Sequence, residues 1–141
     1  MYNKNIEIKF VTSWKEDEIV DLYKAGGWWK ERYNKSAINS IIAGSFAFAV
    51  AIDLSTEKAI GMGRVISDGT SDAYIQDTVV LPDYQRRGIG ERLVKSLIDH
   101  CISKGIGWIG LIAEPGKDSF YKTLGLKPMK NYVPMIYRPE D

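Results

Sequence analysis

The stretch VVLPDYQRRGIGERL, from Val79 to Leu93, joins an apolar run to a helical pattern through two arginines and two glycines. N–H groups at the start of a helix have no intrahelical acceptor, so together with the helix dipole they favour an anion. Gly88 and Gly90 also permit a positive φ and a close approach of the backbone. These residues leave two interpretations open, an ordinary solvated turn and a cradle for a phosphate.

Two common nucleotide-binding motifs are excluded at this loop. The dinucleotide fingerprint requires a third glycine where Leu93 stands. The P-loop requires Gly-Lys-Ser/Thr over residues 90–92, which are Gly, Glu and Arg. Neither of those nucleotide folds fits the chain.

The pattern of apolar residues along the chain predicts an α/β protein of mixed order. Ser13 and Glu16 have the spacing of a capping box, and the helix that they begin would end near Gly26. The three central strands are expected to be antiparallel, whereas a crossover helix brings the strands at 73–81 and 108–113 together in parallel. We expect strands over 6–11, 46–53, 59–67, 73–81, 108–113 and near 132–138, and helices after Ser13, over 36–43, from Gly90 to Gly105 and over 117–124.

The composition indicates one globular domain over residues 1–141. A net charge of +1 argues against nucleic acid and membrane surfaces as general partners. Cys101 is the single cysteine, which excludes an intramolecular disulfide and a cysteine zinc cluster, and no metal site is expected. The N-terminus lacks the apolar core of a signal peptide and no apolar run is long enough to span a membrane, so we expect a cytoplasmic location.

Two motifs make the interpretation specific. The opening stretch resembles the acetyl-CoA motif of the GCN5-related N-acetyltransferases (GNAT), Gln/Arg-x-x-Gly-x-Gly/Ala, which Gln85, Gly88 and Gly90 match. FYKTLGLKPM, Phe120 to Met129, resembles the family's Phe-Tyr-x-x-Leu-Gly-Phe segment, with Leu126 in place of the last phenylalanine. The order of elements over essentially the whole chain agrees with that family. The resemblance implies an α/β fold with a mixed, mostly antiparallel sheet, flanked by helices, whose fourth and fifth strands splay apart.

The resemblance also implies where acetyl-CoA would bind. Its pantetheine arm would lie along the fourth strand, and backbone amides of the loop would hold the pyrophosphate. The arginine side chains of the loop either reach the ribose phosphate or face water. The expected cofactor-binding residues are Thr78, Val79, Val80, Gln85, Arg86, Arg87, Gly88, Ile89, Gly90 and Glu91.

Three residues are candidates for the chemistry. Tyr121 matches the family position whose phenol protonates the leaving thiolate, and its alternative is a tyrosine of the core. Asp77 is the first candidate for the base that accepts the proton of the attacking amine, and its alternative is a polar partner for nearby backbone. Glu114 is the second, and it stands where many family members carry an asparagine.

The acceptor pocket implied by the resemblance is framed by Trp28, Trp29 and Tyr74. The two tryptophan rings either stack on an amine or hold a cation, or they pack the early helices onto the sheet. We expect acetyl transfer from acetyl-CoA to a primary amine of a small molecule. Direct attack in a ternary complex is expected because Cys101 falls on an apolar helix stripe, which disfavours a covalent route. The alternatives are a protein N-acetyltransferase and a non-catalytic acetyl-CoA-binding module. A homodimer is compatible with the sequence.

Overall fold

The computed structural model describes residues 5–139. The chain divides into two compact units, residues 1–111 and residues 112–141. The first unit holds a five-stranded sheet in the order β1-β2-β3-β4-β5, antiparallel except for the parallel pair β4–β5. The strands are β1 (Ile6–Phe10), β2 (Ala47–Asp53), β3 (Lys58–Ser67), β4 (Asp72–Val80) and β5 (Trp108–Gly110).

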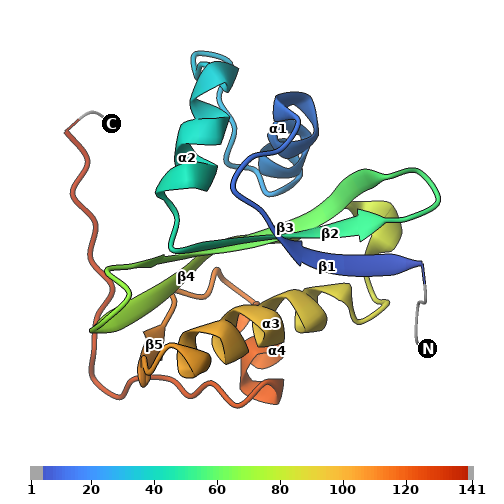
Figure 1. Cartoon of the computed structure of the whole chain (residues 1–141). Helices are drawn as coiled ribbons and strands as arrows, with labels where there is room; N and C mark the ends of the chain where they lie inside the picture. The colour runs from blue at the N-terminus through green and yellow to red at the C-terminus, as the bar shows by residue number, and fades with distance from the viewer. Residues whose placement is uncertain (1–4, 140–141) are drawn as a thin grey trace. The chain divides into compact units, whose positions relative to one another are not determined.

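Helices cover both faces of this sheet. Helices α1 (Glu16–Ala25) and α2 (Ile38–Gly44) lie on one face, and α3 (Ile89–Ser103) lies on the other (Figure 1). A short 3-10 helix, η1 (Lys35–Ala37), leads into α2, and a second, η2 (Pro82–Tyr84), follows β4. The apolar sides of these helices bury most of the sheet, which is the main stabilising term for such a layered domain.

The core on the α1 and α2 face is one cluster of buried side chains. It joins the apolar stripe of α1 to alternate residues of the central strands. Its members are Ile19, Val20, Leu22, Tyr23, Ile38, Ile42, Phe48, Val50, Ile52, Ala59 and Met62, with Val11, Trp14, Trp28, Trp29, Val79 and Leu81 packed against it.

On the opposite face, α3 packs closely against β3 because two strand residues lack side chains. A Cβ at Gly61 would lie 3.2 Å from Cδ1 of Leu93, and a Cβ at Gly63 would lie 3.0 Å from Cδ1 of Leu97. Both distances are shorter than ordinary packing contacts, so larger residues would push the helix away. The start of α3 is thereby held close to the end of β4.

Most of the expected elements are confirmed, but the start of α1 was predicted wrongly. Helix α1 begins at Glu16 with Lys15 at the N-cap, and no side chain caps it, so Ser13 does not form a capping box. The backbone N–H of Trp14 instead donates to Oδ1 of Asn39 at 2.9 Å. Tertiary contact with the α2 region thus decides how the chain enters α1.

Two strand predictions also need correction. The strand expected over 108–113 has three residues, Trp108–Gly110. The segment 132–138, expected to be a strand, has no regular structure, and Tyr132, Val133, Met135, Ile136 and Tyr137 are 73–89% exposed. A strand requires a neighbour for its backbone hydrogen bonds, and the only regular element described in residues 112–139 is α4 (Asp118–Thr123).

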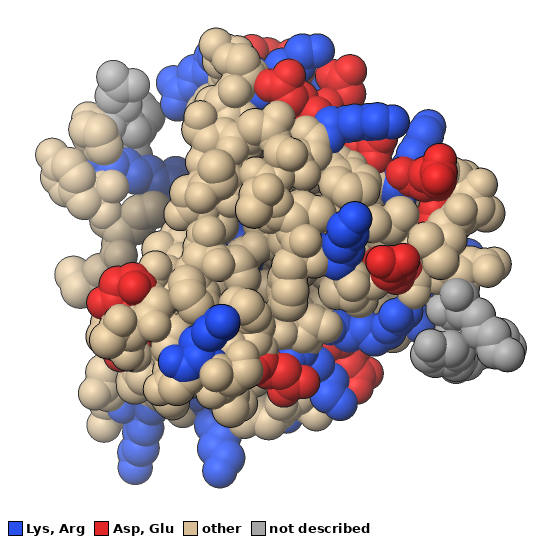
Figure 2. All heavy atoms as spheres, viewed as in Figure 1, with Lys and Arg blue, Asp and Glu red and all other residues tan. Residues whose placement is uncertain are grey.

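Charge is distributed without a dominant sign on the face in Figure 2, where Lys and Arg alternate with Asp and Glu around a broad uncharged area. Within residues 5–139 no helix is long and apolar enough to cross a membrane. The same residues include no group of three or more His, Cys, Asp or Glu side chains suited to a metal ion.

Candidate active site

Strand β4 extends well beyond β5, the strand with which it pairs in parallel. β5 pairs with β4 only at Asp72, Ala73 and Tyr74, whereas β4 continues to Val80. The N–H of Leu81 donates to the carbonyl of Ile60 at 2.9 Å, so Leu81 directs its backbone toward β3. Because these directions alternate along a strand, Val80 directs its N–H and carbonyl to the opposite side, where β5 has ended. Beyond the end of β5 this edge of β4 therefore has no strand neighbour among the described residues, and the Val80 carbonyl accepts from Nε2 of Gln85 instead.

A β-bulge lies in β4 beyond Tyr74, the last residue that pairs with β5. Met62 pairs with Val79 and Arg64 pairs with Gln76, so Asp77 and Thr78 together stand opposite Gly63. Asp77 has a φ of 58°, in the left-handed region. A bulge bends its strand and increases the local twist, and it reverses which face the following side chains occupy. The bulge thus bends β4 beyond the end of its pairing with β5.

The carboxylate of Asp77 is held by two side chains from other elements. Nε of Arg64 lies 2.6 Å from Oδ2 of Asp77, and the Tyr23 hydroxyl donates to the same oxygen at 2.8 Å. The side chains of Arg64 and Asp77 are only 18% and 21% exposed, so the ion pair is partly shielded from water. Both donors use Oδ2, which leaves Oδ1 free of protein partners within the described residues.

Tyr23 stays protonated at neutral pH. Burial, and next the nearby Asp77 carboxylate, raise the pKa of the Tyr23 phenol above its ordinary value, while the Arg64 cation opposes this. The ring of Tyr23 meets that of Trp28 edge to face, with centroids 6.2 Å apart. On the α1 face of the sheet the rings of Tyr23 and Trp28 therefore lie next to each other, with the Tyr23 hydroxyl bound to the Asp77 carboxylate.

The loop after β4 is shaped by backbone conformation. Arg86 and Gly88 have positive φ values of 63° and 79°. Helix α3 begins directly after Gly88, and no side chain caps its first turn. The first N–H that finds an acceptor is that of Arg92, bonded to the Gly88 carbonyl at 3.1 Å, so the amides of residues 89–91 remain available for an anion.

Two side-chain contacts hold this loop in place. The Gln85 amide donates from Nε2 to the Val80 carbonyl at 2.9 Å, which closes the turn onto the end of β4. The Tyr84 hydroxyl donates to Oδ2 of Asp53 at 2.6 Å, at the end of β2. Hydrogen bonds from Ser55 and Tyr84 lower the pKa of the buried Asp53 carboxyl below its ordinary value. Asp53 is thus an ionised anchor for the loop.

The side chain of Thr78 is the second feature of the bulge. Its hydroxyl is buried and has no hydrogen-bond partner among the described residues. It lies beside Gly63, where an added Cβ would be 3.2 Å from Oγ1 of Thr78. A buried unpaired hydroxyl is unfavourable, by about 1–3 kcal/mol, and such a group often marks a ligand site.

Comparison with known proteins agrees with this geometry. The model of the Acetyltransferase (GNAT) family matches residues 10–126. The chain belongs to the GNAT family. A GNAT-family acetyltransferase from Streptococcus pneumoniae has the same fold, with a TM-score of 0.78 and 26% identity over 96% of this chain and 99% of that one.

Two curated relatives of this GNAT protein extend the comparison. The uncharacterised N-acetyltransferase ycf52 of Pyropia yezoensis is 32% identical over 123 residues, which are 87% of this chain and 66% of the relative. The histone acetyltransferase TAP1 of Glycine max is 38% identical over 71 residues, 50% of this chain and 31% of the relative. The chain therefore spans less than two thirds of the length of each.

The other two candidate catalytic residues of this GNAT chain lie in the unit of residues 112–141. Tyr121 is half-buried on α4, and its ring meets that of Phe120 edge to face with centroids 5.1 Å apart. Glu114 is exposed, and its backbone carbonyl accepts from the N–H of Lys117 at 2.9 Å. Glu114 therefore precedes α4, and Tyr121 lies within it.

The structure separates the three expected acceptor-binding residues. The Trp28 ring contacts the ring of Tyr23, and the Tyr23 hydroxyl in turn donates to Asp77. Trp29 pairs with Tyr33 at 5.5 Å, and Tyr74 pairs with Trp108 at 5.3 Å beside the pairing of β4 with β5. Trp28 and Trp29 are both half-buried and pack against the core, so part of each ring serves to pack the core, as one of the two interpretations expected.

Sequence reasoning missed Arg64, Tyr23 and the Asp53–Tyr84 pair. Tyr23 lies on the apolar stripe of α1 and reads as a core residue, and Arg64 reads as an ordinary polar residue of a strand. Only pairing of β3 with β4 brings Arg64 to Asp77, 13 positions away. A local sequence signal for this cluster does not exist.

Proposed function

We propose that this GNAT protein transfers the acetyl group of acetyl-CoA to an amine. The observation that carries the proposal is the edge of β4 that has no strand neighbour beyond β5, beside an uncapped helix start. GNAT proteins use acetyl-CoA as the acetyl donor, and its thioester supplies an activated acetyl group. In our proposal the backbone from Thr78 to Val80 lies along the pantetheine arm, and the amides from Arg86 to Glu91 bind the pyrophosphate.

The residues present fit such a ligand. The amides of residues 89–91 lack intrahelical acceptors, and the Thr78 hydroxyl lacks a partner. The side chains of Arg86 and Arg87 are exposed, and the Arg87 guanidinium lies 5.3 Å from the centre of the Tyr84 ring. Arg87 is thus positioned by a cation–π contact beside the loop, where it would add positive charge.

Asp77 is our candidate for the group that receives the proton of the attacking amine. An amine attacks a thioester only when it is neutral, so a base or a water chain must take its proton. Arg64 and Tyr23 fix Oδ2 of Asp77, which leaves Oδ1 for an ammonium or a water. Trp28, beside Tyr23, offers an aromatic face to the same cation.

Direct transfer within a ternary complex is our proposed route. A covalent route requires a nucleophile, and the chain has one cysteine. Cys101 is buried on α3, and burial raises the pKa of its thiol, which disfavours the reactive thiolate. Tyr121 would protonate the departing thiolate, by the motif match, and Glu114, which stands where many family members carry an asparagine, remains the second candidate carboxylate.

We favour a small-molecule amine as acceptor, and a protein amine is the second candidate. The small-molecule proposal rests on the Asp77 carboxylate and the neighbouring rings of Tyr23 and Trp28, which suit one compact cation. The protein alternative is favoured by the likeness to the TAP1 protein, which is named a histone acetyltransferase.

We also propose a cytoplasmic location, which cell fractionation tests.

Mass spectrometry of acetyl transfer tests the proposal. Acetyl-CoA is incubated with the protein and a panel of small amines and lysine-containing peptides, beside the variant Tyr121→Phe. We expect acetylated amines with wild type and transfer about 10²-fold slower with the variant, at retained acetyl-CoA affinity. Tight binding without transfer to any acceptor would instead support a non-catalytic acetyl-CoA-binding module.

A further inference from the structure

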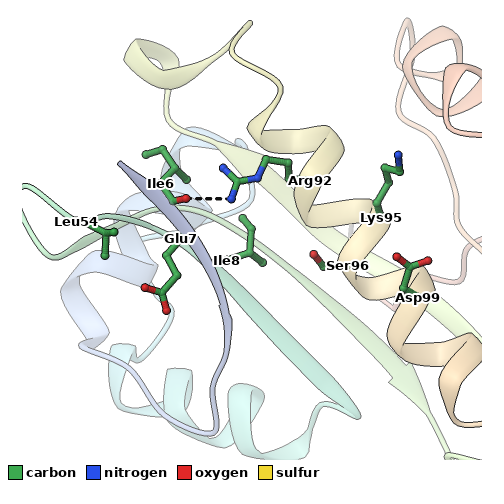
Figure 3. Close-up of a pocket in the computed structure, with 8 residues that line it drawn as sticks. All are labelled: Ile6, Glu7, Ile8, Leu54, Arg92, Lys95, Ser96 and Asp99. Carbon is green, nitrogen blue, oxygen red and sulfur yellow. Dashed lines mark hydrogen bonds between the residues drawn. The ribbon is translucent and has the colours of Figure 1, made fainter. Parts of the chain in front are cut away.

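A hollow lies between β1 and α3, at the edge of the sheet opposite to β5 (Figure 3). Its volume is about 520 Å³. The two apolar side chains Ile6 and Ile8 of β1 face α3 across it, and Arg92 spans it to reach the Ile6 carbonyl at 3.0 Å. The lining residues are Ile6, Glu7, Ile8, Leu54, Arg92, Lys95, Ser96 and Asp99.

The outer edge of β1 carries unpaired backbone groups. The N–H of Val11 donates to Phe48 at 2.9 Å, and the N–H of Leu54 donates to Asn5 at 2.8 Å, so Asn5 and Val11 point their backbone at β2. Because the direction alternates along an antiparallel strand, Ile8 directs its N–H and carbonyl outward. Among the described residues nothing hydrogen-bonds to the backbone of Ile8.

The sequence of this edge is complementary to itself. When IEIKF, residues 6–10, is paired antiparallel with a second copy about Ile8, Ile6 meets Phe10 and Ile8 meets Ile8. Glu7 of each copy then meets Lys9 of the other. Both charged side chains are exposed, and opposite charges directly across a strand pair are stabilising.

We propose that β1 is the interface between two copies of this chain, related by a two-fold axis at Ile8. The two Ile8 residues would exchange both backbone hydrogen bonds, and two five-stranded sheets would join into one. Such an interface is isologous, as the two-fold symmetry of most homodimers requires. The Ile6 carbonyl keeps its bond to Arg92, because a carbonyl oxygen accepts two hydrogen bonds.

The charges that line the hollow fit a second copy of this chain better than a strongly charged partner such as a polyanion. The charged lining residues are two cations, Arg92 and Lys95, and two anions, Glu7 and Asp99. A balanced surface neither attracts a polyanion nor repels its own copy. The exposed edge strand is also a surface that proteins either pair or protect.

Sedimentation velocity over a wide range of protein concentration tests the proposal. We expect a reversible wild-type dimer, weakened about tenfold or more by Glu7→Lys or by Lys9→Glu, each of which places like charges across the axis. The double substitution of Glu7→Lys with Lys9→Glu restores opposite charges and should restore the dimer. The matched controls Lys30→Glu and Glu31→Lys, at exposed residues of the loop after α1, should leave it unchanged.

Three results would overturn the proposal: a wild-type monomer at every concentration, a dimer that neither single change weakens, or a double variant that stays as weak as the single ones. Circular dichroism confirms that each variant folds. The proposed dimer does not depend on acetyl transfer. Acetyl-CoA affinity is therefore measured on the monomeric variants as well, so that loss of the dimer and loss of the cofactor site can be told apart.

Discussion

Nε of Arg64 lies 2.6 Å from Oδ2 of Asp77, across the bulge in β4. The ion pair joins β3 to β4 where their register shifts, and the Tyr23 hydroxyl adds a bond from α1. Three elements distant in sequence therefore meet at one carboxylate oxygen. The second oxygen faces no protein donor within the described residues, so it is the atom to test.

Replacing Asp77 with asparagine tests its role as proton acceptor. Asp77→Asn keeps a side chain of the same size but removes the negative charge. We expect kcat to fall by about 10²-fold while the affinity for acetyl-CoA is kept, because the amine loses its base. Loss of the ion pair should also reduce the free energy of unfolding by about 1–3 kcal/mol.

Steady-state kinetics and denaturation, measured on the same preparations, separate those two effects. Asp72→Asn is the matched control, since Asp72 is an exposed carboxylate at the start of β4. Unchanged kcat in a folded Asp77→Asn protein would exclude Asp77 from proton transfer.

The Tyr23 phenol gives the protein a specific sensitivity to alkali. Its pKa in the folded state is raised, whereas an unfolded tyrosine titrates near its ordinary value of about 10. Above that pH the unfolded state loses a proton that the folded state keeps, so stability falls as pH rises. The slope for one such group approaches about 1.4 kcal/mol per pH unit.

Urea denaturation between neutral pH and strong alkali measures this slope. We expect Tyr23→Phe to be less stable than wild type at neutral pH and to lose stability less steeply above pH 10. An ultraviolet titration should show one late-ionising phenol fewer. Tyr33→Phe is the control, since Tyr33 is an exposed tyrosine; identical slopes in wild type and Tyr23→Phe would contradict the prediction.

The buried hydroxyl of Thr78 should cost stability in the unliganded protein. Thr78→Val replaces the unpaired hydroxyl with a methyl group of similar shape. We expect the variant to gain about 1 kcal/mol, since a buried unsatisfied polar atom is removed. If acetyl-CoA provides the missing partner, it should raise the melting temperature less in the variant than in wild type.

Thermal unfolding with and without acetyl-CoA measures both effects. Thr12→Val is the control at an exposed threonine. A Thr78→Val protein that is less stable than wild type and responds fully to acetyl-CoA would show that the hydroxyl has no ligand role.

The conformation of Gly88 allows the charge of the loop to be tested separately from its shape. Gly88 has a φ of 79°, and apart from its two chain neighbours no residue has an atom within 4 Å of a Cβ placed there. Asparagine and aspartate both adopt this conformation more readily than other residues. We expect Gly88→Asp to bind acetyl-CoA about tenfold or more weakly than Gly88→Asn, because only the former brings a negative charge to the pyrophosphate.

Isothermal titration calorimetry with acetyl-CoA measures the difference between the two variants. Their shared backbone cost cancels in the comparison. Equal affinities would place the pyrophosphate away from this loop.

Local patterns in the sequence were sufficient for much of this protein. Apolar periodicity predicted the order of the elements, including the antiparallel strands β2, β3 and β4 and the parallel pairing of β5. The loop from Gln85 to Gly90 was also evident, since glycine spacing and a helix start are local features. Local signals work here because each depends on residues only a few positions apart.

Tertiary structure alone decided the rest. Strand register is set by contacts between distant residues, so the bulge at Asp77 and its bond to Arg64 have no local signature. The same dependence explains why Ser13 does not cap α1 and why β5 ends at Gly110. The sequence by itself determined most of the helices and strands and the glycine-containing loop after β4. Packing of β3, β4 and α1 determined which oxygen of Asp77 is left without a protein donor.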